Sequence, residues 1–497
     1  MGEAQAFFFE PSFNRAVKVR ATDDRLTSDA GALLLREADS KLGLTESLAA
    51  KLIDPRNPEK IRYDLVELVR ERLYGMANGY STQDDADRLA HDPAFKLAVW
   101  DRPGENVINE RLASQPTQSR LIDTLARPTN LAALRESLAD WSHRHLKAVG
   151  GDRPAQYVTI DIDSFPLVAT GDQEGAKYNG YYCKKIFHPI VASYCVAGDY
   201  DATREGFRLG NGFVHATLRA GNVHTAEGIK RFLLETIRKT KSFAEAVDIR
   251  IDAGLVEGPV LDMLTREKVR FIGRIKSNAI LERMADPHVS RPPGRPPQGG
   301  YEYTVELGMY QAASWKHPQR IVLVVVDRPN KQGQLNLSPD YFFLVVGWKQ
   351  AELSADESLA HYRKRGTFED RLGEFNQAIG AKLPSQKFRE NEATLLLALL
   401  AFNMANMLRI EMETTAGSCW DLGRFQRDVL KAGGSVVKHS RRLVLNLAKA
   451  IVPLWEVMKT CIAAWRFPAS FAAPCGAYSH AWTPLPCHAF REDTRRG

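Results

Sequence analysis

YVTIDIDSF, residues 157–165, is the point at which the chain changes from a helical pattern to a strand pattern. Apolar and polar residues alternate along it, which is typical of a β-strand. Successive side chains of a strand point to opposite faces, so Asp161 and Asp163 share one face while Ile160 and Ile162 share the other. The pattern therefore predicts a strand that carries acids toward its end, next to a turn.

The sequence after this strand predicts a mixed β-sheet with helices on its faces. Two helices are predicted, over residues 225–240 and 256–268. The other strands are predicted over residues 188–198, 207–221, 246–254 and 269–276. Three sequential strands followed by alternating helices and strands favour a mixed sheet covered by helices. The fold class expected here is therefore α/β.

A β-rich stretch interrupts the α/β pattern. It follows a linker rich in Pro, Gly and Arg, residues 286–300, which has no hydrophobic periodicity. Its strands are predicted at EYTVEL and over residues 320–327 and 340–347. A helix then begins at Ser354, which forms the capping-box pattern with Glu357, and runs toward Gly380. The α/β region is thus expected to contain a β-rich insertion before its last helix.

Helical periodicity fills both flanks of this region. From Ser28 to about Leu146, apolar residues recur at the i, i+3, i+4 spacing of amphipathic helices. After Gly380 the same spacing predicts helices over residues 388–413, 420–432 and 436–465, followed by a Pro-rich end. The α/β core is therefore expected to lie between all-helical N- and C-terminal regions.

Composition excludes several classes of protein. Of the 497 residues, 44% are hydrophobic and 26% are charged, which is typical of a folded soluble protein and excludes a mostly disordered chain. The net charge of +7 allows a polyanionic partner without requiring one. Six cysteines without a C-x-x-C pair argue against a zinc ribbon and fit a reducing compartment.

The most apolar stretch, TLLLALLAFNMANMLRI from Thr394, is interrupted by Asn403 and Asn406. It is shorter than the roughly 20 apolar residues that span a bilayer. We therefore expect a buried core helix there, no membrane partner and a cytoplasmic location.

Three acids stand out by their placement. Asp163 and Asp252 each end a predicted strand, and Glu369 shares one face of a predicted helix with Tyr362 and Arg365. Any one of them alone is more often a surface acid or half of an ion pair. Three carboxylates in one place repel each other and need a cation. All-oxygen ligands favour Mg²⁺ or Mn²⁺, and two such ions stabilise the attacking and leaving oxygens of a phosphodiester displacement.

The order of these motifs resembles the DDE transposases of bacterial insertion sequences. The resemblance is to groups with a β insertion before the helix Tyr362-x-x-Arg365-x-x-x-Glu369. The resemblance extends to five further stretches, namely VTIDIDSF, IRIDAG and the N-terminal GALLLREAD, NGYSTQDDADRLAHDP and LASQPTQSR. It spans roughly residues 28–465, and its strength lies in the order and spacing of the motifs.

This resemblance implies an RNase H-like catalytic core with two Asp and one Glu that bind Mg²⁺ or Mn²⁺. The first Asp corresponds to Asp163, with Asp161 as the alternative, and the other two acids to Asp252 and Glu369. Such enzymes cut DNA at the ends of their element and join the 3′-OH ends to target DNA. One departure is Asn376, because related helices often carry Lys at that position.

The resemblance also implies contacts with DNA, made by basic and polar side chains. The candidates are Tyr362, Arg365, Arg120, Lys184, Lys185, Lys438, Arg441 and Arg442. Arg365 is expected to clamp a phosphate, the alternative being an ion pair with Glu369. VVKHSRRLVLNLAK is expected to be a basic amphipathic helix that faces either DNA or solvent.

Two further groups of residues have open roles. The segment from Thr117 to Arg120 resembles the start of a recognition helix with Ser114 as its N-cap, or is a packing helix. Trp315 and Trp348 are candidates to stack on a flipped base, although burial in the core is the more common role of tryptophan.

The expected partners are double-stranded DNA, as terminal inverted repeats and as target, and a second copy of the chain in a homodimer on DNA, associated with the nucleoid. The expected organisation is a helical DNA-binding region (1–150), the first part of the core (151–278), a β-rich insertion (279–350), the catalytic helix (351–385) and a helical C-terminal region with a mobile tail (386–497). Two alternatives stay open: a metal-dependent nuclease without strand transfer, and a DNA-binding descendant without catalysis.

Overall fold

A computed structural model describes residues 25–465 apart from short gaps, together with residues 12–13 and 16–19. The gaps are residues 103–104, 152–153, 197–209, 225, 292–296, 298, 330–334, 336–337, 417–419 and 441. The expected mobile tail after residue 465, most of the Pro-rich linker and Arg441 lie outside the described residues.

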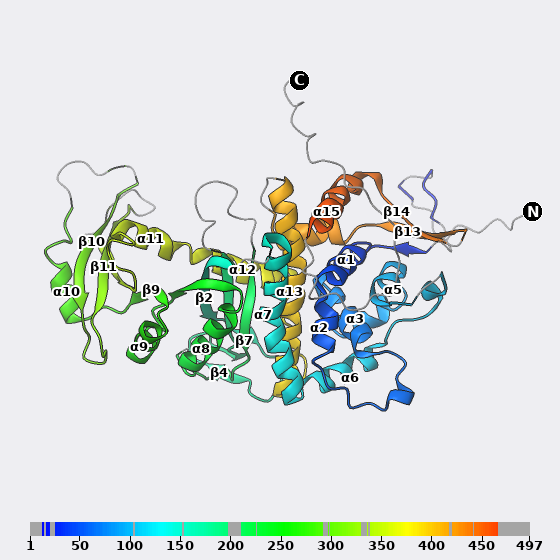
Figure 1. Cartoon of the computed structure of the whole chain (residues 1–497), viewed down its shortest axis with the longest axis horizontal. Helices are drawn as coiled ribbons and strands as arrows, with labels where there is room; N and C mark the ends of the chain where they lie inside the picture. Colours follow the sequence, from blue (N-terminus) through cyan, green and yellow to red (C-terminus); the bar gives the residue numbers. More distant parts are fainter. Residues whose placement is uncertain are drawn as a thin grey trace, which may run out of the picture.

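An eight-stranded mixed sheet forms the centre of the fold, in the order β10-β11-β12-β9-β8-β2-β6-β7 (Figure 1). β2 pairs parallel with β8 and β8 with β9, while the other pairs are antiparallel. The strands are β2 (Ala155–Ser164), β6 (Ile190–Val196), β7 (Asn211–Thr217), β8 (Ala244–Ile251), β9 (Arg270–Ile275), β10 (Tyr301–Tyr310), β11 (Gln319–Asp327) and β12 (Asp340–Val346). The predicted mixed sheet with helices around it is confirmed.

The β-rich stretch continues this sheet. β12 pairs antiparallel with β9, so β10, β11 and β12 extend one edge of the sheet, at the left of Figure 1. β11 is an unbroken apolar run because both of its faces are covered. Ile321, Leu323 and Val325 join one hydrophobic cluster, and Val322 and Val324 join another.

Helices cover the two faces of the sheet. On one face lie α8 (Ile229–Thr240), α9 (Gly258–Arg266) and α10 (Ala279–Ala285), whose apolar side chains share a cluster with Ile160 and Ile162 of β2. On the other face lie α11 (Ala355–Arg363) and α12 (Gly366–Ala378). Since side chains alternate along β2, its two acids point toward the face that carries α11 and α12.

α13 (Phe388–Ala416) is the long helix at the centre of Figure 1. It is mostly apolar, and every residue from Asn391 to Ile410 is buried. By length and composition it could cross a membrane, and it is the single described helix for which this holds, but its apolar window is wholly buried inside the fold. The predicted core helix is therefore confirmed.

The N-terminal helices pack around α13, most of them on the side away from the sheet, whereas the last of them, α7, also packs against β7 (Figure 1). They are α1 (Ala32–Leu42), α2 (Leu44–Ala49), α3 (Leu65–Ala77), α4 (Asp85–Leu89), α5 (Pro93–Val99), α6 (Gln115–Leu125) and α7 (Pro128–Gly150). Their apolar side chains form one hydrophobic cluster with α13 and with Phe213 and Ala216 of β7. The helical region and the sheet thus share a core.

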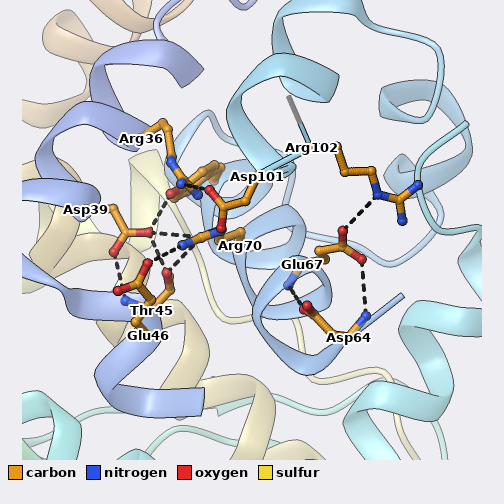
Figure 2. Close-up of polar contacts among 10 residues, drawn as sticks. Arg36, Asp39, Thr45, Glu46, Asp64, Glu67, Arg70, Asp101 and Arg102 are labelled. Atoms are coloured by element: carbon orange, nitrogen blue, oxygen red, sulfur yellow. Dashed lines mark hydrogen bonds and ion pairs between the residues drawn. The ribbon is translucent and has the colours of Figure 1, made fainter. Parts of the chain in front are cut away.

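A buried polar network joins the first three of these helices (Figure 2). The Arg70 guanidinium on α3 lies 2.5 Å from Asp101 and 3.1 Å from Glu46, and it donates to the Thr45 hydroxyl at 3.0 Å. Asp39 on α1 accepts from Thr45 and from a tyrosine of α3. A buried arginine is tolerated here because its donors are matched by acceptors.

A second, small sheet was not predicted. It consists of β3 (Leu167–Val168), β5 (Lys184–Phe187) and β4 (Lys177–Asn179) in that order, all antiparallel. These strands are two to four residues long, which is too short for an alternating pattern to be recognised in sequence.

The prediction of an all-helical C-terminal region was wrong. The segment expected to be the basic helix VVKHSRRLVLNLAK is a hairpin of β13 (Gly434–His439) and β14 (Arg442–Leu447), and a helix, α15 (Val452–Ala464), follows it. Exposure alternates along β14, and Ser440 turns the chain with φ of 51°. β13 also pairs with β1 (Leu26–Thr27), so a distant strand stabilises the extended form of this β-branched segment.

Candidate active site

Two acids lie side by side where two parallel strands end. In the register of β2 and β8, Asp161 stands opposite Arg250. Asp163 lies two residues further along β2, Asp252 directly follows the last residue of β8, and neighbouring strands are about 4.8 Å apart. The carboxyl ends of parallel strands meet at one edge, so the pairing of β2 and β8 brings these two acids together.

The helix expected from Ser354 to Gly380 is broken. α11 ends at Arg363 and α12 begins at Gly366, with a turn in which the Arg365 N–H bonds the Tyr362 carbonyl at 3.0 Å. The expectation of one continuous helical face was therefore wrong. The break occurs before a glycine, the ordinary residue least favourable to a helix interior after proline.

Arg365 joins the helix to the strand. Its Nη2 lies 2.6 Å from Asp163 Oδ2 and its Nη1 lies 2.9 Å from Glu369 Oε1. The arginine side chain is 9% exposed and that of Glu369 is 65% exposed, so the acid reaches inward from the surface to a buried cation. The ion pair with Glu369 that was one sequence alternative is present, and the contact with Asp163 adds a second partner.

The pKa values reflect this crowding of charge. Burial raises the pKa of Asp163, and the negative charge of Asp252 adds to the rise while Arg365 opposes it. Burial lowers the pKa of Arg365, but Asp163 and Asp252 more than offset that effect, so the net shift is upward. Asp252 thus acts electrostatically on both Asp163 and Arg365, while Arg365 itself contacts Asp163 and Glu369.

Tyr362 is half-buried beside the same charges. Burial raises the pKa of its hydroxyl, and Asp252 and Glu369 raise it further against the effect of Arg365. It therefore stays a neutral hydrogen-bond donor near neutral pH.

Asp161 has a different environment. It is 2% exposed and forms two bonds with Arg250, from Nε at 2.8 Å and from Nη2 at 2.6 Å. Arg250 is fully buried and also donates to the His361 carbonyl at 3.2 Å. Asp161 therefore has its oxygens occupied behind the site, whereas Asp163 lies at its surface.

The hairpin of β4 and β5 adds two tyrosines that sequence reasoning missed. Tyr182 lies close enough to Asp163 for the carboxylate charge to raise the pKa of its hydroxyl, after burial as the larger cause. Tyr181 packs edge-on against it and is 89% exposed. The motif YNGYYCKK, a turn between aromatic residues, is the signal that could have identified this hairpin.

Apart from Tyr362 and Arg365, the described residues predicted to contact DNA lie in three separate places. Lys184 is exposed at the start of β5, and Lys185 beside it forms an ion pair with Asp172. Lys438 and Arg442 are exposed on the β13–β14 hairpin, and Arg120 is exposed on α6. Tyr362 and Arg365 are thus the members of the set that lie among the acids.

The tryptophans and Asn376 occupy ordinary positions. Trp348 is 7% exposed and packs against His361, so it cannot stack on a base in this arrangement. Trp315 is half-buried against Tyr310. Asn376 is exposed on α12.

The acids fit a divalent metal ion by their chemistry. Asp163, Asp252 and Glu369 offer only oxygen, the donor atom that Mg²⁺ and Mn²⁺ prefer. The Arg365 guanidinium contacts two of them, so a cation is already accommodated between their oxygens. Among the described residues, no three His, Cys, Asp or Glu side chains lie close enough together to hold a metal ion.

A protein-family model, the transposase DDE domain of group 1, matches residues 9–465 of the chain. The chain belongs to this family. DDE transposases generally use divalent metal ions, and the matched range contains Asp163, Asp252 and Glu369. The resemblance to DDE transposases that the sequence motifs indicated is thereby confirmed at the level of the family.

Other comparisons add less. No curated protein matches the chain. A cryo-EM structure of a piggyBac transposase synaptic complex with hairpin DNA is similar at 12% sequence identity and a TM-score of 0.41, covering 82% of this chain and 80% of that chain.

Proposed function

We propose that this DDE transposase family member cuts DNA at the ends of its insertion sequence and joins the freed 3′-OH ends to target DNA. The observation that carries the proposal is the contact of one buried arginine with both Asp163 and Glu369, on a strand end that also brings Asp252 close. A structural ion pair needs only two partners, whereas here one buried arginine contacts two acids and is influenced by the charge of a third. Such a concentration of charge is more typical of a functional site than of an ion pair that only stabilises the fold.

We propose further that the core is RNase H-like. The support is the order β9-β8-β2-β6-β7 within the sheet, with antiparallel pairing among β2, β6 and β7 and parallel pairing from β2 to β9. The first two acids then lie at the ends of β2 and β8, and the third lies on a helix that packs on the sheet.

The proposed cofactor is Mg²⁺ or Mn²⁺, held by Asp163, Asp252 and Glu369. When bound, the metal supplies a water of lowered pKa and positive charge for the phosphate that is attacked. Side chains of this protein would position the DNA phosphate. Arg365 neutralises the acids in the absence of metal, and once freed it is suited to donate to a backbone phosphate through two N–H groups. Tyr362 offers a neutral hydroxyl beside it.

The proposed partners are double-stranded DNA, as terminal repeats and as target, and a second copy of this chain in a homodimer on DNA. The proposed location is the cytoplasm, on the nucleoid. In this proposal, residues 151–278 and 351–385 carry the chemistry and residues 1–150, 279–350 and 386–497 bind DNA or support the core. The exposed cations Lys184, Lys438 and Arg442 are the proposed phosphate contacts outside the site.

The test is a pair of neighbouring substitutions on α12. Glu369→Gln removes one charge that contacts Arg365, whereas Asp370→Asn removes the same charge from an exposed side chain one residue away. We expect Glu369→Gln to abolish cleavage of duplexes carrying the element ends in Mg²⁺, with DNA binding unchanged or slightly tighter because a negative charge is gone. Asp370→Asn should cleave as the unaltered protein does. A fully active Glu369→Gln protein would refute the proposal.

A second assay separates the transposase from a nuclease. The unaltered protein is supplied with element-end duplex, target plasmid and Mg²⁺, and joined products are measured beside cut ends. Joined product supports strand transfer. Cut ends without joined product would replace the proposal with a metal-dependent nuclease, and binding without cutting would replace it with a DNA-binding descendant.

A further inference from the structure

A basic groove lies in the N-terminal helical region, between the segment before α3 and the start of α6. Its volume is about 630 Å³. None of the residues that line it is an Asp or a Glu, and its five cationic members are Arg56, Lys60, Arg62, Arg111 and Arg120. We call this hollow the basic groove.

Some cations of the basic groove lack the ion pairs that neighbouring arginines make. In the same region Arg70 contacts Asp101 and Glu46, and Arg102 contacts Glu67 at 3.3 Å (Figure 2). In the basic groove, by contrast, Lys60 and Arg120 make no ion pair with any described residue.

The other three cations differ in how firmly they are held. Arg62 lies 5.3 Å from the ring centre of Tyr63, a contact that leaves its charge intact. Arg111 reaches Asp87 at 3.4 Å between two exposed side chains, and Arg56 is bound by Asp54 at 2.7 Å. Three of the five cations, Lys60, Arg62 and Arg120, therefore face the hollow without a carboxylate partner among the described residues, an arrangement that attracts an anion.

The other lining groups are also suited to phosphate. Ser114 and Thr117 line the basic groove at the start of α6, and their hydroxyl oxygens lie 3.3 Å from each other. Ser114 is the N-cap of this 11-residue helix and makes no side-chain capping bond, so the contact with Thr117 is the one its hydroxyl makes among the described residues.

The burial of α6 argues against sequence-specific contacts between this helix and DNA bases. Gln118, the residue that would lead a recognition helix, is 1% exposed and donates weakly to the Leu68 carbonyl at 3.5 Å. Arg120 is the exposed member of that turn, and it faces the basic groove. The segment from Thr117 to Arg120 can therefore contact backbone phosphates but cannot present its glutamine to a base edge.

The basic groove is separate from the acids. α6 packs against α7 and α13, which in turn contact β7, so two helices stand between the basic groove and the sheet (Figure 1). A phosphate held there belongs to a different stretch of DNA from the phosphate at Asp163 and Glu369.

We propose that the basic groove binds the phosphate backbone of double-stranded DNA without regard to sequence, at a distance from the cleavage site. The identity of the polyanion rests on the proposed DNA-processing function. The spread of cations over two chain segments suits a run of phosphates better than one small anion, because each cation can meet its own phosphate.

The test measures binding in the cleavage-deficient Glu369→Gln background, so that chemistry plays no part. A triple change, Lys60→Gln with Arg62→Gln and Arg120→Gln, is compared with a matched change of three exposed cations on α8 and α9, Lys230→Gln with Arg238→Gln and Arg266→Gln. We expect the basic-groove variant to bind element-end and random duplexes about tenfold or more weakly at about 0.1 M salt. Its log–log salt slope should shrink by about 0.9 for each phosphate that the variant no longer neutralises. The control should change affinity less than the basic-groove variant on both duplexes.

A second measurement uses the unaltered protein, so it does not depend on a variant that folds. Lysines are labelled by reductive methylation with and without duplex DNA, and the labelled sites are read by mass spectrometry. Protection of Lys60 but not of Lys230 supports the proposal, and equal labelling of Lys60 in both conditions overturns it.

Two other outcomes overturn the proposal: unchanged affinity and salt slope in the basic-groove variant, or an equal loss in the control. Failure of this inference can be distinguished from failure of the proposed activity. A protein that loses DNA binding with the basic groove but never cuts DNA keeps this inference and loses the transposase proposal. A protein that cuts and joins DNA while the basic-groove variant binds normally does the reverse.

Discussion

Arg365 decides how the acids of the site behave. Its guanidinium contacts Asp163 and Glu369, so it competes with a metal ion for the same oxygens. Removing its charge leaves acids that repel each other and favour a divalent cation more strongly. We expect Arg365→Gln to bind Mn²⁺ more tightly in the absence of DNA, measured by calorimetry, while cleavage falls because the proposed phosphate contact is removed. Weaker Mn²⁺ binding would show that Arg365 supports the metal site instead.

Substitution of the two acids of β2 should have different effects, because Asp161 supports the stability of the fold and Asp163 is proposed to take part in cleavage. Asp161→Asn leaves the fully buried Arg250 without its charged partner, and breaking a buried pair costs roughly 3–5 kcal/mol. Asp163→Asn should change the free energy of unfolding by less than about 1 kcal/mol, since its side chain is 27% exposed, but should abolish cleavage. Denaturant unfolding and end cleavage of both variants test this. Equal stability losses would contradict the assignment.

Glu71 on α3 should make stability depend on pH. Burial raises the pKa of its carboxyl from 4.5 to about 8, against the bond it accepts from the Ala113 N–H. Its stabilising contribution is therefore complete below pH 4.5 and is lost as pH rises through about 8. Between these values the free energy of unfolding falls by about 1.4 kcal/mol per pH unit from this group. We expect Glu71→Gln to flatten the fall of melting temperature over that interval, and parallel curves would contradict it.

At the scale of elements, the start of α1 is fastened to the C-terminal region by close backbone contact. Gly31 donates to the Leu430 carbonyl at 3.0 Å, and a Cβ at Gly31 would lie 2.3 Å from Leu430 Cα. We expect Gly31→Ala to lower the free energy of unfolding by roughly 1–3 kcal/mol or more, as overpacking does.

Gly366→Ala is the matched control for this contact. A Cβ at Gly366 would meet no atom within 4 Å, and its backbone has no positive φ. We expect it to be neutral or to add up to about 1 kcal/mol to the free energy of unfolding. Thermal unfolding of the two variants checks the contrast, and similar losses in both would show that the contact with Leu430 does not matter.

At the scale of the whole molecule, the shared core around α13 predicts that the chain folds as one unit. The hydrophobic cluster on α13 includes side chains of α1 to α7 as well as Phe213 of the sheet. A fragment of residues 156–497 would expose much of this apolar surface to water. We expect it to aggregate or to lack a cooperative unfolding transition, whereas the full chain unfolds in one transition by calorimetry. A soluble, cooperatively folded fragment would contradict this.

Local sequence patterns predicted the elements whose signal is local. The alternation in YVTIDIDSF, the capping box at Ser354 and the apolar stretch from Thr394 each predicted the right element, because period and propensity act within a few residues. The order of the acids Asp163, Asp252 and Glu369 along the chain indicated the family, because order and spacing can be read from the sequence without knowing which residues are in contact.

Contacts between distant residues decided the rest. VVKHSRRLVLNLAK has a pattern compatible with helix and strand, and pairing with Leu26 and Thr27 gives the strand. Asp161 and Asp163 are two residues apart on one face, and what separates them is that Arg250 comes from β8 and Arg365 from the start of α12. Such choices depend on which charges and strands the folded chain brings together, and sequence periodicity carries no information about partners 89 or 202 residues away.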